Sequence, residues 1–353
     1  MKNYKIWGIG LVAYVLLLLI VVGALTGVID PFFHYRAPLE QLEYPIDNQR
    51  YQNDGIMKHF DYDAMIIGSS MTENFRTSEM DRLFDVNAIK VPFSGPPFPE
   101  LNQNLRTALK ANPDIKMVIY GLETWYIFAA KDETRTDASY PTYLYDEKLL
   151  NDVNYLLNKD VLFSDTLEVL LYTGRGEKTT SFDDYSNWRH FVFSHEETLR
   201  NYPRPEITET QRQVTAEEME LIRYNMEQIV TLAREYPDVQ FHYYFPPYSA
   251  LYWDEVRRNG KLDYMIDSLK LASEVALQAE NVLLHSLLDG YEVVLDLNHY
   301  RDTVHHSGEI NTWVLEKLRE GDHRLTLENN EAHWESLREF YSNYDFEVYF
   351  TQE

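Results

Sequence analysis

Three side chains that lie far apart in the sequence have the types that serine-dependent acyl chemistry requires. Ser70 ends the run Gly68-Ser69-Ser70, and Asp302 precedes His305 by three residues. A carboxylate at that spacing can hold one ring nitrogen of an imidazole, which leaves the other ring nitrogen free to accept the proton of a serine hydroxyl. The sequence therefore predicts Ser70 as nucleophile, His305 as general base and Asp302 as the group that orients the base.

The Asp-x-x-His spacing occurs twice, because Asp296 and His299 repeat it just before Asp302 and His305. We expect His305 to be the base, since a predicted helix begins at Gly308 directly after it. His299 lies one short loop earlier and should face the rim of the site.

A metal site is the alternative use of the same stretch. Its potential ligands are Asp296, His299, Asp302, His305 and His306. Zinc sites use compact ligand spacings that this stretch lacks. We therefore expect no metal and no cofactor, and we expect His306 to point away from the nucleophile.

The elements that must position these residues alternate along the chain. Short apolar runs at 64–67, 86–91, 116–120, 239–245 and 282–285 predict strands, and helical patterns occupy 99–111, 216–236, 262–279 and 308–319. This alternation predicts an α/β fold, namely a flavodoxin-like three-layer α/β/α domain with a mostly parallel five-stranded sheet. Ligand sites of such sheets lie beyond the carboxyl ends of the strands, where Ser70 and Gly95 fall.

The blocks resemble those of the SGNH (GDSL-type) hydrolase superfamily, over roughly residues 61–319. The family's Gly-x-Ser block after the first strand is matched by Gly68-Ser69-Ser70, its second-block glycine by Gly95 in Ser94-Gly95, and its last block by Asp302 to His305. The resemblance implies a catalytic Ser70, His305 and Asp302, and an oxyanion hole that includes the amides of Ser70 and Gly95.

The third block departs from the family pattern. The family carries an asparagine in a Gly-x-Asn setting, whereas this chain reads Gly121-Leu122-Glu123-Thr124-Trp125. Thr124 is expected to supply the missing oxyanion donor through its hydroxyl, because an ionised Glu123 can only accept hydrogen bonds. Trp125 and Tyr248, at predicted strand ends, are expected to bind substrate by stacking on a sugar or acyl group.

An apolar segment precedes the predicted domain. Residues 6–29 contain no charge and follow Lys2 and Lys5, and as a helix they would span roughly 36 Å, enough for a bilayer core of about 30 Å. We expect an uncleaved single-pass anchor rather than a signal peptide, with a cytoplasmic N-terminus and an extracellular domain. The expected organisation is an anchor at 1–29, a connector at 30–61, a catalytic domain at 62–320 with an insertion at 130–205, and a peripheral C-terminal segment at 321–353. The insertion is expected to be a lid or acceptor surface, or else a second small domain.

Composition excludes several classes of function. The formal net charge is −25, so a nucleic-acid partner is not expected. The chain has no cysteine, which excludes disulfides, thiolate nucleophiles and cysteine-ligated metals. A cysteine-free exported protein is compatible with a bacterial cell envelope.

The anchored architecture is similar to that of envelope acyl-transfer members of the superfamily, such as the D-alanyl-lipoteichoic-acid transfer protein and the alginate O-acetylation proteins. It implies an extracytoplasmic serine acyltransferase or esterase that acts on acyl esters of an envelope polysaccharide or teichoic acid. The expected partners are a glycan or teichoic acid acceptor, a membrane acyl-donor protein and the membrane itself. Transfer is favoured over hydrolysis. The alternative is a non-catalytic envelope scaffold that keeps the fold.

Overall fold

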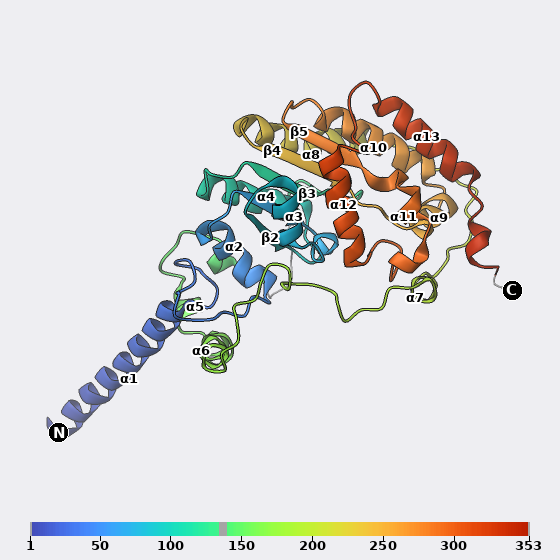
Figure 1. Ribbon diagram of the computed structural model, residues 1–353. Helices are drawn as coiled ribbons and strands as arrows, with labels where there is room; N and C mark the ends of the chain where they lie inside the picture. Colours follow the sequence, from blue (N-terminus) through green and yellow to red (C-terminus); the bar gives the residue numbers. More distant parts are fainter. Residues whose placement is uncertain (1, 134–139, 352–353) are drawn as a thin grey trace. The chain divides into compact units, whose positions relative to one another are not determined.

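The computed structural model describes residues 2–133 and 140–351, which fall into two compact units (Figure 1). The sheet unit comprises 62–135 and 182–353, and the anchor unit comprises 1–61 and 136–181.

The sheet unit is built on a five-stranded sheet with the strand order β2-β1-β3-β4-β5. All four pairings are parallel, and this is the doubly wound order of flavodoxin-like folds. The strands are β1 (Ala64–Gly68), β2 (Ala88–Pro92), β3 (Met117–Gly121), β4 (Gln240–Phe245) and β5 (Val282–Ser286). Every residue of β1, β2 and β3 is buried, as expected for parallel strands that are covered on both faces. The predicted fold class is confirmed.

Helices cover the sheet and pack against one another. The longer ones are α3 (Thr77–Phe84), α4 (Phe98–Ala111), α8 (Ala216–Glu235), α9 (Ala250–Arg258), α10 (Leu262–Ala276), α12 (Gly308–Glu320) and α13 (Asn330–Asn343), and two short ones are α7 (His195–Arg200) and α11 (Tyr291–Val294). Figure 1 shows α3 and α12 side by side, and their buried residues join those of β1 and β3 in one core cluster. Helix α8 packs against α10 and α4.

The predicted strands and helices of the sheet unit agree with the observed ones to within a few residues, although the unit contains further helices. Helices α3 and α9 follow the first and fourth strands but were not expected, because each is too short to show a sustained helical period. The C-terminal segment is less peripheral than expected, since Trp334 and Tyr341 of α13 are fully buried.

The anchor unit contains a long apolar helix and several short ones. Its elements are α1 (Lys2–Ile29), α2 (Gln49–His59), α5 (Val153–Leu156), the π-helix η4 (Val161–Thr166) and α6 (Leu167–Gly174). Residues 4–29 of α1 are long and apolar enough to cross a membrane. The expected connector at 30–61 belongs to this unit, and Phe32 packs there on Tyr155. The expected insertion at 130–205 is divided, because 136–181 belong to the anchor unit whereas 182–205 belong to the sheet unit.

Candidate active site

The turn after β1 presents Ser70 at the start of a short 3₁₀ helix, η1 (Ser70–Thr72). A Cβ atom at Gly68 would lie 2.5 Å from Cγ2 of Thr72, so only glycine lets the chain fold back this tightly. The hydroxyl of Ser69 accepts a hydrogen bond from the Met71 amide at 3.1 Å and caps η1. The local sequence thus fixes the turn and leaves the half-buried Ser70 at its corner.

The loop before α12 places His305 against Ser70. The Nε2 atom of His305 lies 3.0 Å from Ser70 Oγ, and its Nδ1 atom lies 2.8 Å from Asp302 Oδ2. The other carboxylate oxygen of Asp302 accepts the backbone amides of Val304 at 3.0 Å and His305 at 2.8 Å. The three residues predicted from the two sequence motifs are therefore joined in one hydrogen-bonded chain.

The electrostatics of this chain suit a base held by a carboxylate. Burial raises the pKa of Asp302, but the hydrogen bond and charge of His305, together with the two backbone amides, outweigh burial, so the net pKa lies below its ordinary value. Asp302 is thus an ionised acceptor that holds the Nδ1–H group of His305. The Nε2 atom of the same ring is then left to accept a hydrogen bond from the Ser70 hydroxyl.

Further contacts tie the two halves of the site together. The Asn311 side chain, on α12, donates to the Met71 carbonyl at 3.0 Å. The Asn74 side chain donates to the His306 carbonyl at 3.3 Å. Buried Lys90 in β2 donates to the carbonyls of Glu73 and Phe75, just after η1, and burial lowers its pKa to about 7. The spacing of nucleophile and base is therefore set by the packing of β2, η1 and α12.

The neighbouring histidines take other positions. His299 Nε2 lies 3.6 Å from Asp296 Oδ2, and Asp296 Oδ1 accepts from the Asn298 amide rather than from its own histidine's backbone. His306 is buried, and burial lowers its pKa to about 4. The imidazole that lies within hydrogen-bonding distance of the Ser70 hydroxyl is that of His305.

Glu123, which stands in the place of the family's asparagine, occupies the centre of a buried network. The side chain is fully buried. The hydroxyls of Ser69 and Tyr248 donate to its two carboxylate oxygens. Burial raises the pKa of Glu123 to about 7, although both hydrogen bonds and the charge of His305 act in the opposite direction. Sequence reasoning treated Glu123 only as a failed donor and missed this network.

Thr124 and Tyr248 are both fully buried. The Oγ1 atom of Thr124 lies 2.8 Å from the hydroxyl of Tyr252. Tyr248 stacks on Trp125 with ring centroids 5.8 Å apart, and its hydroxyl donates to Glu123. The predicted roles of Thr124 as an oxyanion donor and of Tyr248 in substrate binding stay predictions.

One cavity opens directly onto the nucleophile. It has a volume of about 420 Å³, and its lining includes Ser69, Ser70, Gly95, Phe98 and Trp125. Gly95 has φ +56°, a left-handed conformation that suits glycine, and the space beside its Cα is open. Trp125 is 46% exposed, so its ring forms an accessible wall of the cavity. The predicted nucleophile, oxyanion glycine and aromatic binding residue thus share one cavity.

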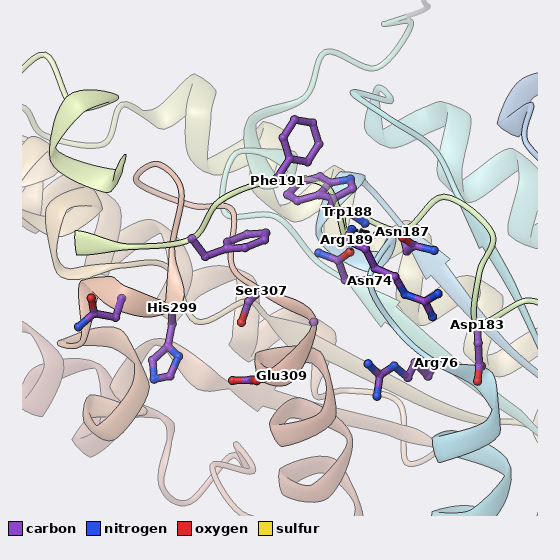
Figure 2. A pocket seen from close by; sticks show the side chains of 13 residues that line it. Asn74, Arg76, Asp183, Asn187, Trp188, Arg189, Phe191, His299, Ser307 and Glu309 are labelled. Carbon is purple, nitrogen blue, oxygen red and sulfur yellow. Dashed lines mark hydrogen bonds between the residues drawn. The ribbon is translucent and has the colours of Figure 1, made fainter. Parts of the chain in front are cut away.

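A second cavity has Trp188 in its lining (Figure 2). It has a volume of about 360 Å³ and is lined by Asn74, Arg76, Asp183, Asn187, Trp188, Arg189, Phe191, Phe193, Asn298, His299, Ser307, Gly308 and Glu309. Trp188 links it to the hydrogen-bonded chain of Ser70, His305 and Asp302, because its ring centroid lies 4.8 Å from that of His305. The backbone amide of Trp188 donates to Asn74 at 2.7 Å, and its indole N–H donates to Glu73. Sequence analysis did not single out Trp188, which lies in an irregular segment without periodicity.

Metal ligation is not apparent in the described part of the chain. Within residues 2–133 and 140–351, no group of three or more His, Asp or Glu side chains is arranged to hold a metal ion.

Comparison with known proteins places few constraints on the chain. No protein-family model and no curated protein matches it. Five chains of solved structures match, among them one described as that of a putative platelet activating factor from Streptococcus pneumonia. That structure is 12% identical, with a TM-score of 0.41, and the match covers 77% of this chain and 92% of the other. A likeness at this level shows neither family nor activity, so function has to be inferred from the geometry of the site.

Proposed function

We propose that the sheet unit is a serine enzyme that forms or cleaves esters through an acyl-Ser70 intermediate. The observation that carries this proposal is the hydrogen-bonded chain from Ser70 Oγ through His305 to Asp302, with distances of 3.0 Å and 2.8 Å. Such a chain activates a hydroxyl that is a weak nucleophile at its ordinary pKa.

The proposed reaction has two steps. In the first, His305 Nε2 takes the Ser70 proton as Oγ bonds to the ester carbonyl carbon, and the carbonyl oxygen becomes an oxyanion. The amides of Ser70 and Gly95 donate to that oxyanion. The oxyanion then collapses, the ester's C–O bond breaks, and the leaving alkoxide takes the proton from His305. In the second step, a water or alcohol oxygen gives its proton to His305 Nε2 and bonds to the carbonyl carbon of the acyl-serine. The acyl C–Oγ bond then breaks, and His305 returns the proton to Ser70 Oγ.

Transfer to an acceptor hydroxyl is supported by the cavity beside His305. An acceptor must reach His305 Nε2 to lose its proton, and Trp188 connects the ring of His305 with that cavity. The charges in its lining balance in sign, because Arg76 and Arg189 are cationic whereas Asp183 and Glu309 are anionic. Aromatic, amide and mutually offset charged groups favour a neutral polyhydroxyl ligand. We propose the sugar hydroxyl of an envelope glycan as acceptor, with a membrane protein as acyl donor.

The proposed location follows from α1. Residues 4–29 are apolar enough to cross a membrane, with Lys2 just before their start and Lys5 at their second position. We propose a single-pass anchor with a cytoplasmic N-terminus and the sheet unit outside. Protease added to intact cells should then remove the sheet unit, whereas digestion only after lysis would reverse the topology.

The test of activity supplies an activated acetyl ester to the full chain, with and without an oligosaccharide acceptor. Acetylated oligosaccharide that depends on Ser70 supports transfer. Free acetate at every acceptor concentration supports an esterase instead.

A non-catalytic scaffold is the second candidate function. It is favoured by the third block, where Glu123 replaces an amide donor and the Thr124 hydroxyl is bonded to Tyr252. A folded protein that releases no acetate and forms no acyl-serine with any activated ester would establish the scaffold.

A further inference from the structure

The anchor unit carries large apolar side chains that its own fold leaves uncovered. Leu150 is 94% exposed and Phe163 is 69% exposed. The same stretch also exposes Leu149, Val153, Leu157, Leu167, Leu170 and Leu171. Leu167, Leu170 and Leu171 recur at the spacing of one face of α6, and Phe163 lies in the π-helix just before it. A contiguous exposed apolar surface of this kind typically marks contact with a partner or a membrane.

This surface continues into an apolar cavity beside α1. The cavity has a volume of about 710 Å³. One wall is formed by α1 residues between Leu16 and Val28, and another by Leu149, Leu150, Val153, Leu156 and Leu157. Contact is close, because a Cβ atom at Gly23 would lie 3.4 Å from Leu157, and one at Gly27 would lie 3.2 Å from Leu156. The 149–157 stretch therefore runs against the C-terminal half of α1.

The position of this cavity along α1 determines its depth in a bilayer. From Leu16 to Val28 the helix rises by roughly 18 Å. The whole charge-free stretch 6–29 rises by roughly 36 Å, and the hydrocarbon core is about 30 Å thick. If α1 spans the bilayer, most of this wall lies inside the hydrocarbon. The 149–157 stretch lines the same cavity and so lies at the same depth.

Three polar side chains near the cavity have internal partners, which lowers the cost of placing them beside lipid. Asp152 is buried and accepts from the Tyr35 hydroxyl at 3.0 Å. The Tyr155 hydroxyl donates to Asp30 at 2.8 Å. Arg36 donates to the Gly27 carbonyl at 2.9 Å, at the end of α1. Lys159, Asp160 and Glu168 are also exposed in this stretch, so these charged side chains would lie toward the lipid headgroups and water rather than in the hydrocarbon.

We propose that residues 149–171 form a second membrane contact, which enters the same leaflet as the C-terminal half of α1 and whose cavity is filled by lipid acyl chains. Helix α6 and the preceding π-helix would lie in the interface with Phe163, Leu167, Leu170 and Leu171 toward the lipid. This surface rests on the proposed role of α1 as an anchor and is independent of the chemistry at Ser70.

The absence of native cysteine gives a direct test, because single cysteines can be introduced without background. The full chain is placed in nanodiscs of phosphatidylcholine and phosphatidylglycerol, with nitroxide labels at Leu150→Cys and Phe163→Cys. Val12→Cys, on the exposed surface of α1, is the lipid control, and Glu328→Cys, exposed in the sheet unit, is the aqueous control. Collision with oxygen reports lipid, and collision with a water-soluble nickel complex reports water.

The expected result is that the labels at 150 and 163 collide more with oxygen than with nickel, as at position 12 and unlike position 328. If the labels at 150 and 163 collide mainly with the nickel complex while the label at 12 collides mainly with oxygen, the second membrane contact is wrong and the anchor stands. Nickel accessibility at position 12 overturns the anchor and this contact together. Low collision with both reagents, with spin–spin broadening that disappears on dilution with unlabelled chain, shows instead that a second copy covers the surface.

Discussion

Two Asp-x-x-His pairs lie six residues apart, yet the fold uses them differently. In the Asp302–His305 pair, one carboxylate oxygen lies 2.8 Å from the ring and the other accepts two backbone amides. In the Asp296–His299 pair, the carboxylate instead lies 3.6 Å from the Nε2 atom of the ring. The carboxylate of Asp296 instead accepts the backbone and side-chain amides of Asn298. Only His305 has a serine hydroxyl at its second nitrogen.

The difference shows that the sequence spacing allows a carboxylate to reach an imidazole but does not orient the pair. Orientation comes from the loop before α12, where Asp302 binds the amides of Val304 and His305. It also comes from α12 itself, which Asn311 ties to the nucleophile turn. The Asp296–His299 pair is therefore a natural control with the same chemistry in a different position.

The largest expected effect separates the two histidines. His305→Ala should lower kcat/KM for an activated ester by about 10³–10⁴-fold, because it removes the base. His299→Ala should change it by less than about threefold. Initial rates of acetate release from both purified variants make the comparison. An equal loss in the His299 variant would mean that the choice between the two pairs is wrong.

The two aspartates should differ in the same way. Asp302→Asn should lower kcat/KM by about 10²–10⁴-fold, since an amide no longer holds the imidazole in the required tautomer. Asp296→Asn is the matched control and should leave the rate nearly unchanged. Equal rates for the two variants would show that the 2.8 Å contact does not orient the base.

A third carboxyl, Glu123, extends the comparison to the pH dependence of stability. The pKa of Asp302 is lower in the folded protein than in the unfolded chain. Its contribution to the free energy of unfolding is therefore present above the unfolded pKa and is lost as the pH falls through the folded pKa. The pKa of Glu123 is raised to about 7 in the folded protein. Its contribution to the free energy of unfolding is therefore present below the unfolded pKa and is lost as the pH rises toward 7.

The corresponding variant is Glu123→Gln, which keeps the shape of the side chain and removes its ionisation. Between pH 5 and 8, the wild type should lose up to about 3 kcal/mol of unfolding free energy relative to this variant. Urea titrations of both proteins at the two pH values measure the difference. Parallel pH dependence would mean that Glu123 does not ionise with a raised pKa.

The smallest expected effect concerns the cavity beside His305. Trp188→Phe keeps an aromatic ring there but removes the indole N–H that donates to Glu73. It should lower the ratio of transfer to hydrolysis by about three- to fivefold, which corresponds to about 1 kcal/mol. Trp125→Phe, in the other cavity, should leave the ratio unchanged. The opposite pattern would place the acceptor on the Trp125 side.

The sequence predicted the parts of the site that local chemistry determines. Ser70 and His305 could be found because each lies at a junction with a strand or helix, and a parallel sheet brings such junctions to one edge. Thr124 and Tyr248 could not be placed, because the direction of a side chain after a strand end depends on its packing neighbours. The role of Glu123 required both hydroxyl partners, and Ser69 and Tyr248 lie far from one another in sequence.

The irregular regions were the least predictable. Trp188 approaches His305 through a segment without helical or strand periodicity, so no pattern signalled the contact. The stretch 136–181 also lacked a signal for its association with α1. Its exposed leucines become informative only once the fold shows which of them are uncovered.

The most direct test of the central claim is covalent labelling of the full chain with a fluorophosphonate probe, followed by peptide mapping. The probe should attach to Ser70 in the wild type and in Ser342→Ala, a surface serine control on α13, and it should not attach to Ser70→Ala. Labelling of the Ser70→Ala variant at the wild-type level, or no labelling of a folded wild-type protein, would contradict an activated Ser70 nucleophile.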